Sequence, residues 1–213
     1  MKKYVITIMN NPHSVEAAER CIESAKKFGY EVEMFPAITP ANDVYRMFDY
    51  FEFPTDAFDN NPYSRTEPTM ACFLSHHALW CVANALDESI LILEHDAVFT
   101  SELPDVEIDT LVTFGKPSFG NFQTANAEGL YPLFSKGGSY LGGAHAYAVS
   151  AKGARELISS AMKDAKPTDV FIGNNSVLGA KEYYPWPVVV NDSVSTVQKE
   201  LGCRAKHNRV VPV

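Results

Sequence analysis

The clearest pattern in the chain is an uninterrupted apolar run at residues 90–93, which three polar residues follow. Branched aliphatic residues in such a run are typical of a strand that is buried on both faces, as in a parallel sheet. The polar residues are Glu94, His95 and Asp96, and residues 97–99 are apolar again. Because burying two carboxylates beside a core strand is costly, we expect the strand to end here. Its carboxyl end would then face a cleft, where open α/β sheets bind ligands.

Hydrophobic periodicity predicts alternating strands and helices along the rest of the chain. Strands are predicted at residues 4–9, 31–35, 111–114, 144–149 and 187–190, and helices at residues 12–28, 69–86 and 151–162, with a short helix opening at 166–169. Asn11 and Ser150 are expected to cap two of these helices. The first strand–helix–strand unit is the usual opening of a nucleotide-binding α/β domain, although it lacks a GxGxxG motif.

Three segments show no clear periodicity and are predicted to be irregular. Residues 37–68 contain four prolines and an aromatic cluster, which we interpret as a satellite hydrophobic cluster. Residues 115–140 read as a loop, and glycines at 137–143 would allow close backbone approach, either as a flexible connection or toward a ligand. Residues 192–213 form a tail whose basic patch could close over a diphosphate or stay solvated; its members are Lys199, Arg204, Lys206, His207 and Arg209.

Composition and charge narrow the class of protein. With 213 residues and 46% hydrophobic content, the chain is long enough for one α/β domain spanning residues 1–213. A net charge of -8 disfavours nonspecific binding to nucleic acid or to an anionic membrane. The apolar run near the N-terminus is too short for a signal peptide or a membrane span. The cysteines at positions 21, 72, 81 and 203 form no CxxC pair, so we expect free buried thiols and a cytoplasmic protein.

The acidic strand end is a candidate metal site. In an extended chain Glu94 and Asp96 point to the same side, because side chains alternate with a period of two. Two hard oxygen ligands on one side suit Mg²⁺ or Mn²⁺. The alternative is an ordinary surface turn after a core strand.

Four stretches, in this order, resemble motifs of glycosyltransferase family 25, which includes lipooligosaccharide and collagen galactosyltransferases. They are residues 70–80 (a GCxLSHxxxW-like helix), 90–97 (an ILEDDA-like strand end), 143–154 (close to GTHAYxISxKGA) and 167–169 (PxD). The resemblance implies a single GT-A-like domain in which a mainly parallel sheet is flanked by helices. It also implies lipopolysaccharide biosynthesis, with transfer of a sugar, galactose being one candidate, from a UDP-sugar to a glycan, lipid-linked or other hydroxyl acceptor, with inversion.

The resemblance also implies roles for individual residues. Glu94 and Asp96 would occupy the ends of the family's metal-binding triplet, where Mn²⁺ or Mg²⁺ stabilises the departing diphosphate. His145 would be a further ligand or a donor to a phosphate. Ser75 and His76 would support the site from behind, although a buried histidine such as His76 is more often a hydrogen-bonded core residue.

Inversion needs a general base that deprotonates the acceptor hydroxyl. Asp169 is the candidate, because it matches the family's PxD motif at a helix start. Its alternative role is to stabilise the N-terminus of that helix. Asp192 and Glu67 are reserve candidates.

Two departures from the family pattern keep other functions open. His95 stands where the family has its middle Asp, and residues 9–14 lack the family's arginine-bearing turn, so that Arg20 is the only nearby arginine. The His95 departure favours a non-catalytic relative that binds nucleotide or glycan. A third possibility is a metal-dependent hydrolase that uses a mixed set of ligands, namely His76, His77, Glu94, His95 and Asp96. The sequence names neither the sugar, the acceptor nor the oligomeric state.

Overall fold

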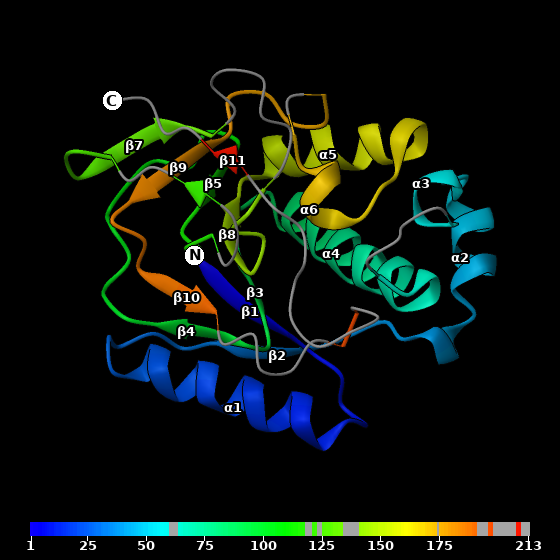
Figure 1. Cartoon of the computed structure of the whole chain (residues 1–213), viewed down its shortest axis with the longest axis horizontal. Helices are drawn as coiled ribbons and strands as arrows, with labels where there is room; N and C mark the ends of the chain where they lie inside the picture. The colour runs from blue at the N-terminus through cyan, green and yellow to red at the C-terminus, as the bar shows by residue number, and fades with distance from the viewer. Residues whose placement is uncertain are drawn as a thin grey trace.

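The computed structural model describes residues 1–59, 64–117, 125–133, 141–173, 175–190 and 196–197, and the backbone of two short strands at 121–122 and 208–209. A seven-stranded sheet forms the centre of this part, with helices on both faces (Figure 1). Its order is β2 (Glu33–Pro36), β1 (Lys2–Thr7), β3 (Ile90–Glu94), β8 (Ala146–Val149), β5 (Leu111–Thr113), β9 (Lys181–Tyr184) and β7 (Gly129–Pro132).

Strand direction makes the sheet mixed but mostly parallel. β1 is parallel to β2 and β3, and β5 is parallel to β9. β8 runs antiparallel between β3 and β5, and β7 runs antiparallel to β9. The predicted α/β class with a mainly parallel sheet is therefore confirmed in strand direction, whereas the GT-A-like arrangement stays a prediction.

The two faces of the sheet carry different helices. α1 (Pro12–Lys26) covers one face, and α4 (Thr66–Leu86), α5 (Ala151–Asp164) and α6 (Thr168–Phe171) lie on the other (Figure 1). Ile90 and Ile92 belong to the core under α4, and Leu91 and Leu93 belong to the core under α1. This alternation confirms that β3 is buried on both faces, as its unbroken apolar run predicts.

The predicted helix caps are present. The Asn11 side chain accepts a hydrogen bond from the backbone N–H of His13, and the Ser150 side chain accepts one from that of Gly153.

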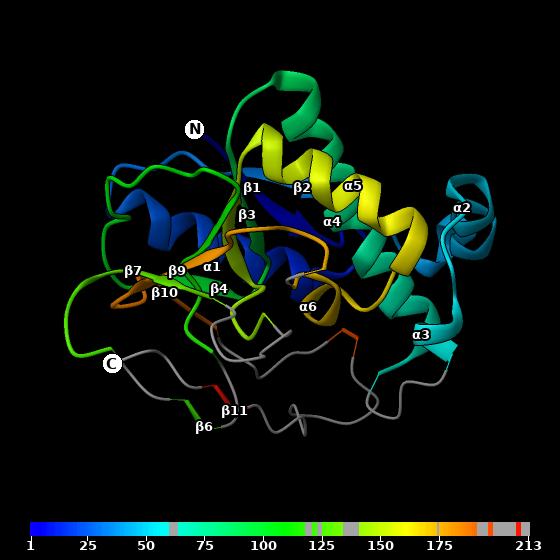
Figure 2. The same ribbon diagram turned by 90° about the horizontal axis from the view of Figure 1, so that it is seen from above.

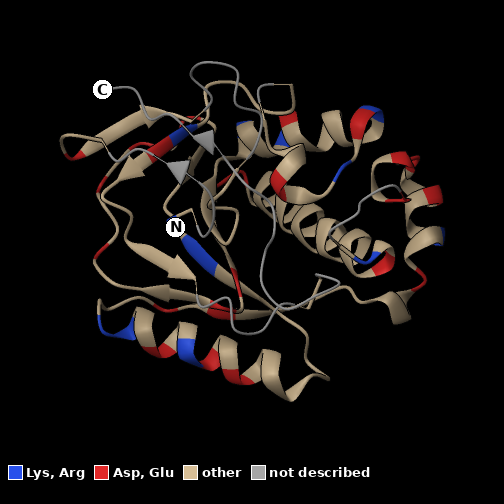
Figure 3. Ribbon diagram, viewed as in Figure 1, with Lys and Arg blue, Asp and Glu red and all other residues tan. Residues whose placement is uncertain are grey.

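Charged residues are spread over the outer side of α1 and over the helices farthest from the sheet (Figure 3). In the part of the chain that the structure describes, no helix has the length and apolar character needed to cross a membrane.

The prediction that residues 37–68 are irregular is wrong. They contain the 3₁₀ turn η1 (Pro40–Asn42), α2 (Val44–Phe51), α3 (Asp56–Asp59) and the first turn of α4. α2 and α3 lie beside α4 at one end of the molecule (Figures 1 and 2). α2 forms because Asp43 caps it through the N–H of Arg46, and because one side of the helix buries Phe48. An aromatic cluster does form here, since Phe48 packs edge-on against Phe53 and Phe58. It is continuous with the core under α4, so the prediction of a separate satellite cluster is wrong.

Short strands also escaped prediction. β7 and β9 at one edge of the main sheet, β4 (Ala97–Phe99), and the paired β6 (Asn121–Phe122) and β11 (Asn208–Arg209) were not predicted. β4 pairs with β10 (Val188–Val190), which confirms the strand predicted at residues 187–190. The missed strands are short and carry too little alternation of apolar and polar residues to be recognised. Residues 134–140 and the side chains of the basic patch lie outside the described residues.

Close backbone approach explains part of the glycine-rich segment. A Cβ atom on Gly143 would lie 2.2 Å from the carbonyl oxygen of Gly115 and 2.7 Å from Oγ1 of Thr113. Gly143 thus allows β5 and the start of β8 to meet, so within the described residues its close approach is to protein backbone.

Of the cysteines, Cys21 is buried, Cys72 is half-buried and Cys81 is exposed, all with free thiols. The expectation of a buried thiol is therefore wrong for Cys81, and Cys203 lies outside the described residues.

Candidate functional site

A pocket of about 550 Å³ lies at the carboxyl ends of β1 and β3. The chain leaves β1 through α1 on one face to reach β2, and it arrives at β3 through α4 on the other face. β1 and β3 are therefore neighbours whose connections diverge, which is the position where open α/β sheets bind ligands. The predicted cleft at the end of the apolar run is confirmed for Glu94 and His95, which both line this pocket.

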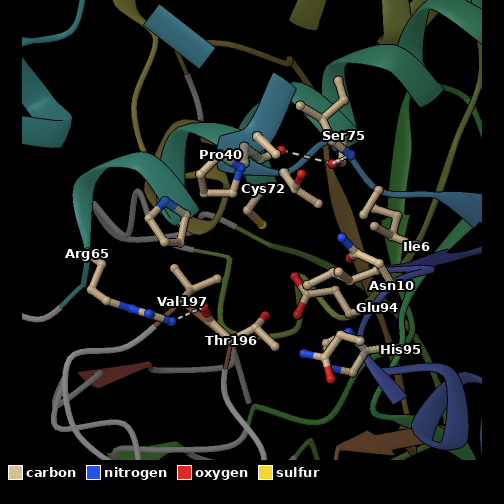
Figure 4. A pocket seen from close by; sticks show the side chains of 18 of the residues that line it. Ile6, Asn10, Pro40, Arg65, Cys72, Ser75, Glu94, His95, Thr196 and Val197 are labelled. Carbon is tan, nitrogen blue, oxygen red and sulfur yellow. Dashed lines mark hydrogen bonds between the residues drawn. The ribbon is translucent and has the colours of Figure 1, made fainter. Parts of the chain in front are cut away.

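Segments distant in sequence form the walls of the pocket. Asn10 and Ile6 come from β1 and the turn after it, residues 37–41 follow β2, and Arg65 precedes α4 on the opposite side (Figure 4). The backbone N–H of Arg65 donates to the carbonyl oxygen of Val197 (3.0 Å), and its guanidinium donates to that of Thr196 (2.5 Å). A short piece of the tail that was expected either to close over a diphosphate or to stay solvated thus forms part of the wall, and the side chains of its basic patch lie outside the described residues.

Glu94 is the acidic group of the pocket. Its side chain is about a third exposed (34%), and Oε1 lies 3.4 Å from Nε2 of the fully buried His76. Burial would raise the pKa of the Glu94 carboxyl, but the interaction with His76 and the nearby imidazoles of His145 and His95 lower it below its usual value. Glu94 therefore presents a carboxylate to the pocket at neutral pH.

His76 belongs to a buried hydrogen-bonded chain. Nε1 of Trp80 donates to Oη of Tyr147 (2.8 Å), and that oxygen lies 2.9 Å from Nδ1 of His76. The chain fixes the orientation of the imidazole, so that Nε2 faces Glu94. His76 is thus the hydrogen-bonded buried histidine that the helix pattern predicts, and it also borders the pocket.

Ser75 ties the pocket wall to α4. Its Oγ donates to the carbonyl oxygen of Ala71 (2.8 Å) and accepts the backbone N–H of Ile38 (2.9 Å). The side chain is fully buried. Ser75 therefore holds the segment after β2 in place, in agreement with the supporting position proposed for it.

Asp96 does not extend the strand on which Glu94 lies. His95 and Asp96 form a turn between β3 and β4, so the extended backbone assumed for a Glu94–Asp96 pair is absent. Asp96 is not among the residues that line the pocket. Burial, with the charge of Asp96 adding to it, raises the pKa of the Cys21 thiol to about 12. Metal binding by Asp96 stays a prediction.

His145 reaches the site because β8 is antiparallel to β3. Its carbonyl oxygen accepts the backbone N–H of Glu94 (2.9 Å), which places the start of β8 beside the end of β3. Burial lowers the pKa of its imidazole to about 4, against the raising effects of Glu94 and of the Val188 backbone. A Cβ on Gly115 would lie 2.7 Å from Nε2 of His145, so the glycine makes room for the ring. His145 lies behind the pocket wall rather than among the lining residues.

Asp169 lies in the first turn of the four-residue helix α6. Its Oδ1 accepts the backbone N–H of the adjacent residue, Val170 (3.0 Å). Burial, followed by the charges of Glu94 and Asp169, raises the pKa of the Cys72 thiol well above its usual value. Asp169 is not among the residues that line the pocket, and its role as a base stays a prediction.

One group of possible ligand atoms includes Glu94. Within the described residues, a sulfur of Cys72, a ring nitrogen of His76 and a carboxylate oxygen of Glu94 all lie within 4.8 Å of one another. Mg²⁺ prefers oxygen ligands throughout, and only one of these three atoms is an oxygen. The residues grouped around Glu94 therefore do not fit Mg²⁺, and they fit Mn²⁺ poorly because of the thiol.

Fold and site together define an α/β protein whose ligand site lies at the topological switch point between β1 and β3. The family model described as glycosyltransferase family 25 (LPS biosynthesis protein) matches residues 1–107, half of the chain, and the protein belongs to this family. The matched part contains β1, α1, β2, α4 and β3, and with them every described pocket residue except Thr196 and Val197. No curated protein matches the chain closely enough to be compared with it.

Proposed function

We propose that the protein transfers a sugar from a UDP-sugar to a hydroxyl of a glycan or lipid-linked acceptor, with inversion at the sugar, in lipopolysaccharide biosynthesis. The family supports glycosyltransferase activity. The observation that carries the proposal is the pocket at the switch point, where Glu94 and the end of β1 face the segment before α4. Donor, acceptor, inversion, the GT-A arrangement and the cytoplasmic location belong to the proposal.

Arg65 is the candidate contact for the donor diphosphate. This chain lacks the family's arginine-bearing turn after β1, and Arg65 is the one arginine or lysine among the described lining residues. Arginine can form two parallel hydrogen bonds to a phosphate. The adjoining N-terminal end of α4 adds a positive dipole. Arg65, just before α4, therefore supplies the positive charge and the hydrogen-bond donors for the diphosphate that the turn after β1 lacks.

The acceptor requires a base on the face opposite the leaving group. Asp169 is our candidate, because it matches the family's PxD motif and lies on α6, which packs against α4. Dependence on Mn²⁺ or Mg²⁺ through Glu94 and Asp96 stays a prediction, and since the grouped residues do not fit these ions we derive no step through them.

The test is a panel of nucleotide sugars, incubated with and without Mn²⁺, in which donor hydrolysis and transfer are followed by release of the nucleoside diphosphate. UDP release that is lost in Glu94→Gln and kept in Glu88→Gln, an exposed matched control, would support the proposal. Absence of turnover with every donor would contradict it. Nucleotide binding without turnover would favour the non-catalytic relative that His95 suggests.

One of the ligands expected for the alternative function, a metal-dependent hydrolase, is His77, and its side chain lies elsewhere. His77 packs against Phe51, Phe53 and Trp80, and burial lowers the pKa of its imidazole to about 4. It points away from Glu94, because neighbouring residues on a helix project about 100° apart. His77 therefore does not join His76 and Glu94 in the mixed ligand set that this alternative names.

A further inference from the structure

Three side chains with different donor atoms converge on the inner wall of the pocket. Cys72 and His76 are four residues apart on α4 and therefore share one face of the helix. Glu94 reaches them from the end of β3, with Oε1 3.4 Å from Nε2 of His76. The three ligand atoms lie within 4.8 Å of one another, which is close enough for small side-chain adjustments to bring them around a single ion.

The orientation of His76 provides a second, independent observation. Its side chain is fully buried, and Nε2 makes no hydrogen bond of good geometry within the described residues, although it faces Oε1 of Glu94 at 3.4 Å. Oη of Tyr147 has two lone pairs and can accept both the Trp80 N–H and an Nδ1–H of His76 at the distances of 2.8 Å and 2.9 Å. In that tautomer the lone pair of Nε2 faces the Glu94 carboxylate, and a cation between the two atoms would take the place of the Nε2–H that the other tautomer directs at this carboxylate.

We propose that Cys72, His76 and Glu94 bind a divalent cation of the zinc class, such as Zn²⁺ or Co²⁺, and leave a fourth position open to the pocket. Thiolate, imidazole and carboxylate are the ligands that Zn²⁺ takes in proteins, and three protein ligands with one open position are typical of catalytic sites. The proposal replaces the Glu94–Asp96 pair and its preference for Mg²⁺ or Mn²⁺. It rests on the proposed function only in placing the ion beside the donor site, because binding itself requires no transfer.

Tyr147 acts in this proposal as the positioning residue for His76. A histidine that binds a metal usually donates its other ring N–H to an oxygen that fixes the tautomer. Oη of Tyr147 has this position and is itself held by Trp80. Tyr147→Phe should weaken cation affinity by roughly 10–100-fold, the usual cost of losing such a partner.

Cobalt substitution tests the site by absorption spectroscopy. The chelator-treated full chain is titrated with Co²⁺, and we expect one equivalent to give a thiolate-to-cobalt charge-transfer band together with the intense visible bands of four-coordinate cobalt. Cys72→Ser should lose the charge-transfer band. Cys81→Ser should keep it, and it is a matched control because Cys81 lies on the same helix, 4.0 Å from His77. No band in the wild-type chain, or a band lost in Cys81→Ser instead, would overturn the proposal.

Carboxylate variants and Tyr147→Phe provide readouts that need no cysteine replacement. Glu94→Gln should lower cobalt affinity, whereas Asp96→Asn should leave the cobalt spectrum unchanged. Loss of the spectrum in Asp96→Asn but not in Glu94→Gln, or unchanged affinity in Tyr147→Phe, would overturn the assignment. A chain that shows the cobalt bands but releases no UDP from any donor would refute the proposed function alone, and active transfer without cobalt binding would refute this inference alone.

Discussion

The two sides of α4 have different environments although they are built from adjacent residues. On the pocket side Cys72, Ser75 and His76 contact polar groups, and each has a partner outside the helix. On the other side Phe73 and His77 pack into a cluster of aromatic rings. His76 and His77 are consecutive, yet one belongs to a hydrogen-bonded chain and the other lies among phenylalanines.

One helix thus separates the residues of the candidate site from residues that stabilise the fold. α4 is buried on both sides, so the burial of a residue on it does not reveal its role; the partners do. Substitutions on the pocket side should change binding or turnover more than stability, and substitutions on the aromatic side should do the reverse. α6 contacts both sides. Phe171 stacks on Trp80, and the charge of Asp169 contributes to raising the pKa of Cys72.

The first prediction concerns Asp169 on α6, and the transfer rate should change most here. Asp169→Asn should lower the transfer rate by roughly 10²–10⁴-fold, the range for losing general acid–base catalysis, with donor affinity and stability nearly unchanged. Steady-state kinetics and calorimetric donor binding measure the two effects separately. Asp164→Asn, an exposed residue nearby on α5 that is paired with Lys166, serves as the control and should remain fully active. A normal rate in Asp169→Asn would leave Asp169 as a helix-start residue only.

The second effect concerns the aromatic side. Phe48 is fully buried and its ring contacts Phe53, Phe58 and Phe73. Phe48→Ala should therefore reduce the free energy of unfolding by about 3–5 kcal/mol, with donor KM unchanged in the protein that remains folded. Urea denaturation measures this, with Tyr50→Ala as the control because Tyr50 is 82% exposed on the same helix. A large change in KM with intact stability would remove the distinction between the two sides.

Strong local signals explain which parts of the fold could be predicted. α1 and α5 were predicted because Asn11 and Ser150 cap them, and β3 because its apolar run is unbroken. α2 was missed because its eight residues begin at a left-handed Asp43, a conformation that no sequence period reveals. β7 and β9 were missed because their pairing depends on partners far along the chain.

Residues of the candidate site could be predicted from the sequence where a single strand or a single helix contains them. Glu94 and His95 were found because they end a core strand, and Ser75 and His76 because they lie in one motif of α4. Arg65 was missed, since only the strand order brings it to the end of β1. The C-terminal tail was considered for its basic patch and not for residues 196–197. Cys72 was noted only as a free thiol, because its proximity to Glu94 depends on how α4 crosses the sheet.

A third prediction concerns the loss of unfolding free energy at low pH that His77 causes. Burial among aromatic rings lowers the pKa of His77 to about 4, whereas an unfolded histidine titrates near 6.5. Between these values the unfolded state binds the extra proton, so stability is full above about pH 6.5 and falls as the pH approaches 4. From pH 7 to pH 5 this should remove about 2 kcal/mol of unfolding free energy.

His77→Leu should abolish this part of the acid sensitivity, because leucine cannot be protonated. Urea denaturation of the metal-free wild-type and variant chains at both pH values gives the difference directly, and subtraction removes the contribution of every other titrating group. If both chains lose the same free energy on acidification, His77 takes up its proton without unfolding, and the aromatic side is more accessible to water than the structure indicates.

The smallest effect concerns Ser75, and it distinguishes the two faces of the sheet as well. Ser75→Ala leaves the N–H of Ile38 without its hydroxyl acceptor, which should cost about 1 kcal/mol of stability and raise donor KM while kcat changes little, because residues 37–41 line the pocket. Ser24 is the matched control: its Oγ donates to the carbonyl oxygen of Cys21 on α1 and accepts the N–H of Phe99, in the same double role away from the pocket. Ser24→Ala should lose similar stability without any change in donor KM. If both variants raise KM equally, the effect reflects a general loosening of the sheet, and the segment after β2 has no special part in donor binding.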